Sequence, residues 1–243
     1  MRGRVWKLAA PVALALLLAG CAEPVRLPAP VTGPLPASAR LAPHLPAREA
    51  AVNFVMAVER VEPVAERFCR AQTARLPCDF RIVIDDRPGQ PPNAFQTLDR
   101  AGRPVIGLTL PLIAGARNVD EIAFVLGHEA AHHILGHIPQ QRDSAAAGAI
   151  LAGVLATLNG ADDAAVRAAQ DVGATLGARR YSQAFELQAD ALGTEIAHRA
   201  GFDPVRGAAF FNRLADPGNR FLGTHPPNAQ RQATVRRVAA SLR

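Results

Sequence analysis

The spacing of apolar and polar residues predicts a long helix followed by a small sheet. Apolar residues recur at helical intervals over 47–72, although Pro63 should kink or split a helix there. The run 79–86 is apolar and β-branched, which is typical of a strand. Two further runs, 93–98 and 103–110, flank the turn sequence Asp-Arg-Ala-Gly and predict a β-hairpin.

The second half of the chain is predicted to be helical. One helix should begin at Asn118, a candidate N-cap, and Glu121 completes a capping-box signature three residues later. Further helices are expected over 181–201 and from Asp203-Pro204, and the arginines of a last helix should form a solvated face. The pattern predicts an α+β fold that is predominantly helical and contains a small β-sheet.

The segment 144–180 is rich in alanine and glycine and predicts a helical hairpin that turns near Asn159 and Gly160. Its apolar run, 145–158, is too short to span a bilayer. Two arrangements are compatible with this pattern. The hairpin can pack against the neighbouring helices, or it can form a lid or a membrane-facing arm.

Residues 1–20 are predicted to be a secretory signal peptide, because basic residues precede a short apolar run and small residues follow it. The sequence Leu-Ala-Gly-Cys at 18–21 resembles the lipobox of bacterial lipoproteins. The resemblance implies cleavage before Cys21 and lipidation of that residue, and Ala22 implies sorting to the outer membrane. We therefore expect a periplasm-facing protein anchored to the membrane through Cys21. The alternative is an ordinary signal peptide with a chance cysteine.

Beyond the signal peptide, the proline-rich residues 21–46 are expected to form an extended tether to one folded domain over 47–243. The whole chain has 27 basic and 21 acidic residues. Three of the basic residues (Arg2, Arg4 and Lys7) belong to the signal peptide, so the remaining chain has a net charge of +3. It contains no basic stripe with interleaved aromatic residues, and nucleic acid is therefore not an expected partner.

Two cysteines, Cys69 and Cys78, occur within the expected domain. An exported protein meets an oxidising compartment, in which a pair of thiols usually forms a disulfide. We expect a Cys69–Cys78 bond that ties the first helix to the strand after it. The alternative is two free, buried thiols.

The stretch Gly-His-Glu-Ala-Ala-His contains the pattern H-E-x-x-H. His128 and His132 are four residues apart on a predicted helix, so their rings project from one face and can bind the same Zn²⁺ ion. Glu129 lies beside them, close enough to reach a water molecule on the metal. The alternative, a helix with surface histidines, is weakened because the helix is apolar enough to be buried.

A third ligand is expected on the helix predicted over 181–201. Glu186 and Asp190 are again four residues apart on one face. Glu186 can complete a His-His-Glu zinc site that leaves a fourth position for water, and Asp190 can accept the N–H group of a ligand histidine. The alternative is a solvated acidic face.

Four segments together resemble a known family. The sequences Asn-Ala-Phe-Gln-Thr at 93–97, 120–137 around the H-E-x-x-H pattern, Glu-Leu-Gln-Ala-Asp at 186–190 and Thr-His-Pro-Pro at 224–227 resemble the zinc metallopeptidase family of the CAAX prenyl protease and the HtpX heat-shock protease. The likeness is greatest to its periplasmic, lipid-anchored branch. It implies a compact gluzincin fold that holds one zinc ion and has its small β-sheet next to the H-E-x-x-H helix.

The resemblance also implies roles for individual residues. His128, His132 and Glu186 match the zinc ligands, and Glu129 matches the general base. His137 matches a histidine that usually has no catalytic role.

His225 lies in an extended segment that approaches the active site in this family. It either donates a hydrogen bond to the oxyanion or occupies the fourth zinc position in a resting state. The alternative for His225 is a loop histidine that merely packs.

The expected function is that of a zinc metalloendopeptidase in cell-envelope protein quality control. An edge strand within 103–109 is expected to bind substrate as an added strand. The family implies unfolded or misassembled envelope proteins as substrates. The alternative from another class is a non-proteolytic or latent zinc-binding lipoprotein that acts as a chaperone or assembly factor for outer-membrane proteins.

Overall fold

The computed structural model describes residues 45–242 except 75 and 214–226, and within this part it leaves out the side chains of 179–182. The predicted signal peptide, Cys21, nearly all of the tether and His225 lie outside the described residues. Among the helices of the described part, none combines the length and the hydropathy that a membrane span requires.

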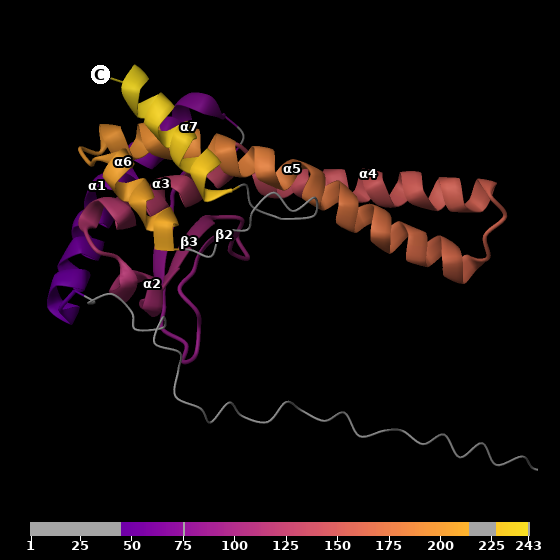
Figure 1. Cartoon of the computed structure of the whole chain (residues 1–243), viewed down its shortest axis with the longest axis horizontal. Coiled ribbons are helices and arrows are strands. Elements are labelled where there is room, and N and C mark those ends of the chain that lie inside the picture. The colour runs from indigo at the N-terminus through magenta and orange to yellow at the C-terminus, as the bar shows by residue number, and fades with distance from the viewer. Residues whose placement is uncertain (1–44, 75, 214–226, 243) are drawn as a thin grey trace, which may run out of the picture. The chain divides into compact units, whose positions relative to one another are not determined.

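The described chain combines helices with one three-stranded sheet (Figure 1), which confirms the predicted α+β and predominantly helical fold. The helices are α1 (Ala47–Gln72), α2 (Leu110–Gly115), α3 (Val119–Ile134), α4 (His137–Leu158), α5 (Asp163–Arg199), α6 (Pro204–Gly207), the 3-10 helix η2 (Ala208–Arg213) and α7 (Asn228–Ser241). The strands are β1 (Arg81–Asp85), β2 (Ala94–Leu98) and β3 (Pro104–Thr109).

The sheet has β3 in the middle. β1 runs parallel to β3 and pairs Ile82 with Ile106, whereas β2 runs antiparallel and pairs Gln96 with the same Ile106. The predicted hairpin is therefore present, and Asp99 accepts backbone hydrogen bonds within its turn. The expectation of an edge strand within 103–109 is wrong, because β3 lies between β1 and β2 and has no free edge. The edge strand beside α3 is β2.

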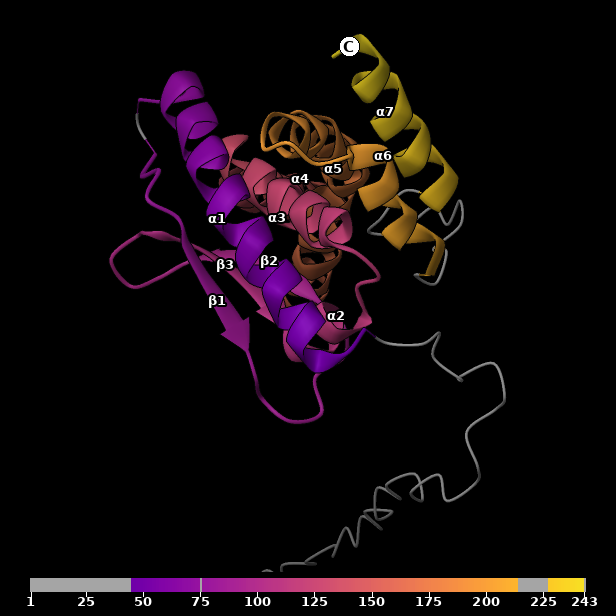
Figure 2. The same ribbon diagram turned by 90° about the vertical axis from the view of Figure 1, so that its left-hand side faces the viewer.

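Helix α3 forms the centre of the core. Of its 16 residues 13 are buried, so neighbours must cover it on several sides. Helix α1 lies along it (Figure 2) and buries Val61, Val64 and Ala65, while α5 packs against it from another side. Of the two predicted effects of Pro63, a kink or a split, the split does not occur, because α1 runs through Pro63 as one helix.

The start of α3 is fixed by buried polar groups. The Asn118 side chain accepts the Glu121 N–H at 3.1 Å, which is the predicted N-cap. The Glu121 carboxylate accepts the backbone N–H of Arg117 at 2.8 Å and pairs with the Arg213 guanidinium. Arg213 ends η2, so one buried ion pair joins η2 to the beginning of α3.

A disulfide joins Cys69, near the end of α1, to Cys78, just before β1. A loop of this size contributes about 2–3 kcal/mol to stability in the chain-entropy model. The neighbouring Pro77 carbonyl accepts a hydrogen bond from His133 Nε2 at 2.8 Å. The disulfide-bonded segment is thereby attached to α3, and His133 faces it.

Helices α4 and α5 form the predicted hairpin, which turns at Asn159 and Gly160, where Gly160 has a φ of 75°. The two helices pack mainly against each other and extend away from the other described elements as an arm (Figure 1). This excludes the arrangement in which the hairpin packs against the rest of the helices. Helix α5 continues from the tip of the arm without a break as far as Arg199.

The crossing of α3 and α5 depends on two glycines. A methyl group on Gly193 would lie 2.8 Å from the His128 nitrogen, and one on Gly127 would lie 2.9 Å from the Gly193 carbonyl oxygen. Such distances are shorter than van der Waals contact, and both neighbours are backbone atoms that have little freedom to move. The two helices can therefore approach this closely only with glycine at both positions.

We predict that Gly193→Ala destabilises the protein by about 1–3 kcal/mol in urea unfolding, because the new methyl group forces α5 away from α3. This loss should outweigh the gain of about 1 kcal/mol that alanine brings to a helix interior. Gly115→Ala is the control, since a methyl group there meets no atom within 4 Å. A Gly193→Ala variant as stable as the Gly115→Ala variant would contradict the prediction.

Candidate metal centre

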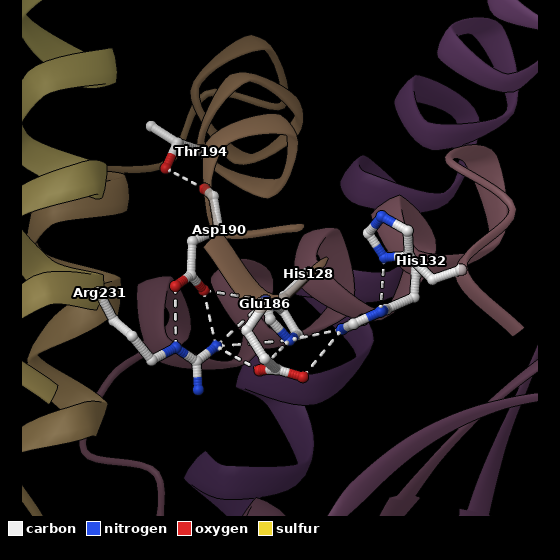
Figure 3. A network of polar contacts seen from close by, with 7 residues as sticks. His128, His132, Glu186, Asp190, Thr194 and Arg231 are labelled. Atoms are coloured by element: carbon white, nitrogen blue, oxygen red, sulfur yellow. Dashed lines mark hydrogen bonds and ion pairs between the residues drawn. The ribbon is translucent and has the colours of Figure 1, made fainter. Parts of the chain in front are cut away.

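Two histidines of α3 and one glutamate of α5 converge on one point (Figure 3). The potential ligand atoms of His128, His132 and Glu186 all lie within 4.8 Å of one another. The two histidine Nε2 atoms are 3.1 Å apart, and each lies 3.5 Å from a Glu186 carboxylate oxygen. Ligands in a tetrahedron with bonds of about 2.0–2.1 Å are separated by about 3.4 Å, so this donor set fits zinc.

Asp190 orients the first histidine. Its Oδ1 atom lies 3.0 Å from His128 Nδ1 and accepts that N–H, which turns the His128 Nε2 atom toward Glu186. Burial is the largest influence on His128 and favours the neutral ring, yet the hydrogen bonds to Asp190 and Glu186 raise its pKa to about 9. The two carboxylates thus favour positive charge at this point, as a cation site requires.

His137 orients the second histidine. Its Nδ1 atom lies 2.9 Å from His132 Nδ1, and its Nε2 atom donates to Gln188 Oε1 at 3.1 Å. Burial, together with the nearby His132, lowers the pKa of His137 to about 4, so the ring is neutral and its Nδ1 atom accepts the His132 N–H. His137 also stacks on Phe185 at 4.3 Å between ring centroids. The family resemblance implied no catalytic role for His137, and this geometry makes it a support for His132.

Arg231 of α7 completes the buried network (Figure 3). Its Nε and Nη2 atoms donate to the two carboxylate oxygens of Asp190 at 2.8 and 2.7 Å, and Nη2 lies 3.3 Å from Glu186 Oε2. The guanidinium carbon lies 3.9 Å from the centroid of the Phe211 ring. Although burial opposes both charges, the pairing raises the pKa of Arg231 and lowers that of Asp190. One arginine therefore pairs with both Asp190 and Glu186 and offsets part of their negative charge.

The expectation that the arginines of the last helix form a solvated face is wrong for Arg231, which is buried. Arg236 and Arg237 are exposed, as expected. A signal was present in the sequence, because Arg231, Val235 and Ala239 follow one another at intervals of four residues and share one buried face. An arginine in phase with apolar residues is typical of a buried, paired charge.

Glu129 lies between His128 and His132 in the sequence, and its side chain is half-buried. It lines the two hollows next to the three candidate ligands. Burial raises the pKa of its carboxyl group, against the opposing effect of His128 and His132. The Glu129 carboxyl therefore holds a proton more readily than an exposed glutamate does, which suits a group that both accepts and donates a proton.

Two hollows are each lined in part by Glu129, His132 and Glu186. One is a cavity of about 360 Å³, and the other has a volume of about 200 Å³. The apolar lining of the larger cavity comprises Pro92, Ala94, Leu112, Phe124, Val125 and the two phenylalanines of η2. The smaller hollow is lined by Gln96 of the edge strand β2 as well as Ile138, Gln141 and Phe185. The ligands thus face a cleft that follows β2.

Comparison with known proteins places this site in a family. Peptidase family M48 matches residues 57–239. A curated protein of Vibrio cholerae serotype O1, named as a putative beta-barrel assembly-enhancing protease, is 34% identical over 129 residues, which are 50% of this chain and 26% of that protein. The chain thus spans about a quarter of the length of this relative. The family match includes all of α3 and α5 and most of α7, which supply the residues of the metal centre, and the chain therefore belongs to peptidase family M48.

Proposed function

We propose that this protein is a zinc-dependent endopeptidase of the cell envelope, anchored by a lipid on Cys21 and facing the periplasm. The observation that carries the proposal is the convergence of His128, His132 and Glu186 within 4.8 Å, with Glu129 beside them. A site that only bound zinc would not need a carboxylate at position 129. The combination therefore favours peptide hydrolysis over a purely structural metal site.

The three ligands would hold one zinc ion, which when bound supplies a Lewis acid and lowers the pKa of water to about 7. Glu129 accepts the proton of the attacking water and delivers it to the leaving amine nitrogen. Asp190 and His137 keep the two histidine rings in the tautomers that leave Nε2 available. Arg231 prevents Asp190 and Glu186 from acting as uncompensated buried charges.

Substrate is proposed to bind along β2 as an added strand. Asn93 accepts a backbone hydrogen bond from Thr109 of β3 at 2.9 Å. Because backbone groups alternate along a strand, Ala94 and Gln96 direct their N–H and C=O groups to the outer edge. That edge runs beside Glu129, and the apolar cavity next to it fits a large apolar side chain of the bound peptide.

The proposed substrates are unfolded or misassembled envelope proteins. The name of the Vibrio cholerae relative, a putative beta-barrel assembly-enhancing protease, supports this class. An added-strand mode of binding also suits it, because an unfolded β-barrel chain offers unpaired strands. His225 and its two possible roles remain predictions.

We predict that the purified protein holds about one zinc ion and that His128→Ala, His132→Ala and Glu186→Ala each lose it, since three protein ligands are the usual minimum of a catalytic zinc site. Metal analysis after dialysis is the measurement. His198→Ala serves as the control, because His198 is exposed on α5. Full zinc occupancy in all three ligand variants would rule out this site.

Glu129→Gln should retain zinc and lose casein cleavage by a factor of about 10²–10⁴, because an amide cannot accept the proton of water. Cleavage is followed on gels with zinc content measured on the same samples. Glu59→Gln, on the exposed side of α1, is the matched control. Undiminished cleavage by Glu129→Gln at equal zinc content would remove Glu129 from the mechanism.

Arg231→Lys should weaken zinc binding about 10–100-fold, because a lysine cannot donate to both Asp190 oxygens and also reach Glu186. Titration with a competing zinc chelator measures the affinity. Arg237→Lys in the same helix is the control, since Arg237 is exposed. If the two variants bind zinc equally well, Arg231 does not position the ligands.

A further inference from the structure

The arm formed by α4 and α5 exposes large apolar side chains along α4. These side chains are 50–78% exposed, whereas such residues are normally buried in helical hairpins. The group comprises Ile150, Leu151, Val154, Leu155 and Leu158, with exposures of 65, 63, 50, 51 and 78%. Their spacing places them on one face of α4, and they form a continuous aliphatic stripe.

The opposite face of α4 packs against α5 through small residues. A methyl group on Gly148 would lie 2.1 Å from the Gly173 carbonyl oxygen, and one on Gly177 would lie 2.1 Å from the Ser144 carbonyl oxygen. The two backbones are therefore in direct contact. Small residues lie inside the hairpin and large apolar residues lie outside, which is the reverse of a water-soluble hairpin and typical of helices packed in lipid.

Charge separates the two sides of the arm. The sequence 144–161 contains no charged residue, whereas α5 carries exposed Arg167 and Asp171 together with two exposed apolar residues, Val172 and Leu176. The uncharged helical part, 144–158, is about 22 Å long, which is shorter than the apolar core of a bilayer at about 30 Å. The arm therefore suits insertion of one side into a single leaflet rather than a membrane span.

A protein partner fits the stripe less well than lipid does. Protein interfaces are enriched in aromatic residues, methionine and arginine, and polar groups at their rims fix the register. The stripe has only aliphatic side chains, and 144–161 contains no aromatic residue, methionine or arginine. Aliphatic side chains without polar partners match acyl chains, which impose no register.

We propose that the arm lies along a membrane surface with residues 144–158 of α4 immersed in the acyl region of one leaflet and the adjacent part of α5 turned toward water. The proposed membrane contact is inferred from the arm alone, whereas the purpose of that contact rests on the proposed peptidase function. Because α5 is continuous from the arm to Glu186, the arm would hold the metal centre at a set distance from the lipid. The peptidase would then act on polypeptides at the membrane surface.

Tryptophan fluorescence tests this orientation in the chain from Cys21 onward, because the one tryptophan of the sequence, Trp6, lies in the predicted signal peptide. Leu151→Trp and Leu155→Trp are mixed with phosphatidylcholine vesicles that carry bromine on the acyl chains. Emission at both positions should shift to the blue and fall by about half or more at low and high salt. Thr175→Trp, exposed on α5 near Asp171, should not be quenched. Equal quenching at all three positions, or none, would overturn the proposal.

A second measurement separates lipid from a second copy of the chain. If the Leu151→Trp emission is blue-shifted without vesicles and the shift reverses on dilution, another copy covers the stripe and the proposal is wrong. Replacing Leu151 and Leu155 together by asparagine should lower vesicle partitioning of the arm about a hundredfold, reported by Val154→Trp in the same chain. Casein cleavage in solution by this variant should be unchanged. If the unsubstituted protein does not cleave casein, the peptidase proposal is contradicted and the proposed membrane contact is unaffected.

Discussion

The metal centre depends on how closely two helices approach. Gly127 and Gly193 allow the backbones of α3 and α5 to touch, and the crossing lies directly beside His128. At this separation the histidine pair of one helix and the acidic pair of the other face each other across a few ångströms. If the axes of α3 and α5 were farther apart, the same four side chains would keep their positions on the helices but could not reach a common ion.

Neutralisation of buried charge is the second requirement. Asp190 is fully buried, and a lone carboxylate there would be strongly destabilising. The hydrogen bonds from His128 and the double contact from Arg231 remove that penalty. Because Arg231 comes from α7, the last described helix is part of the metal centre although it supplies no ligand.

Local spacing in the sequence was sufficient to predict which residues share one face of a helix. His128 and His132, like Glu186 and Asp190, are four residues apart, and helical geometry alone places each pair on one face. The same holds for the hairpin of β2 and β3, whose turn lies between its strands. These features depend on neighbours in the chain, where sequence patterns are most informative.

Features that depend on distant pairing were missed. The sequence analysis assigned the edge of the sheet to β3. Nothing in the run 79–86 indicates that this strand, β1, pairs with β3, or that the two strands run parallel. Arg231 was assigned to a solvated face because its partner Asp190 lies 41 residues away in the chain. The role of His137 required knowledge of Gln188, which only the folding of α5 against α4 brings near it.

The unbroken course of α5 gives the protein a mechanical lever. If α5 turns as a rigid body about its contact with α3 at Gly193, Glu186 lies about 10 Å from this point along the helix axis. The end of the helix at Asp163 lies about 45 Å from the same point. A sideways displacement of about 4 Å at the tip would therefore move Glu186 by roughly 1 Å if the rod stays rigid, which is enough to impair catalysis strongly. A displacement at the far end of α5 would thus reach the side chains of the candidate metal centre, reduced about fourfold.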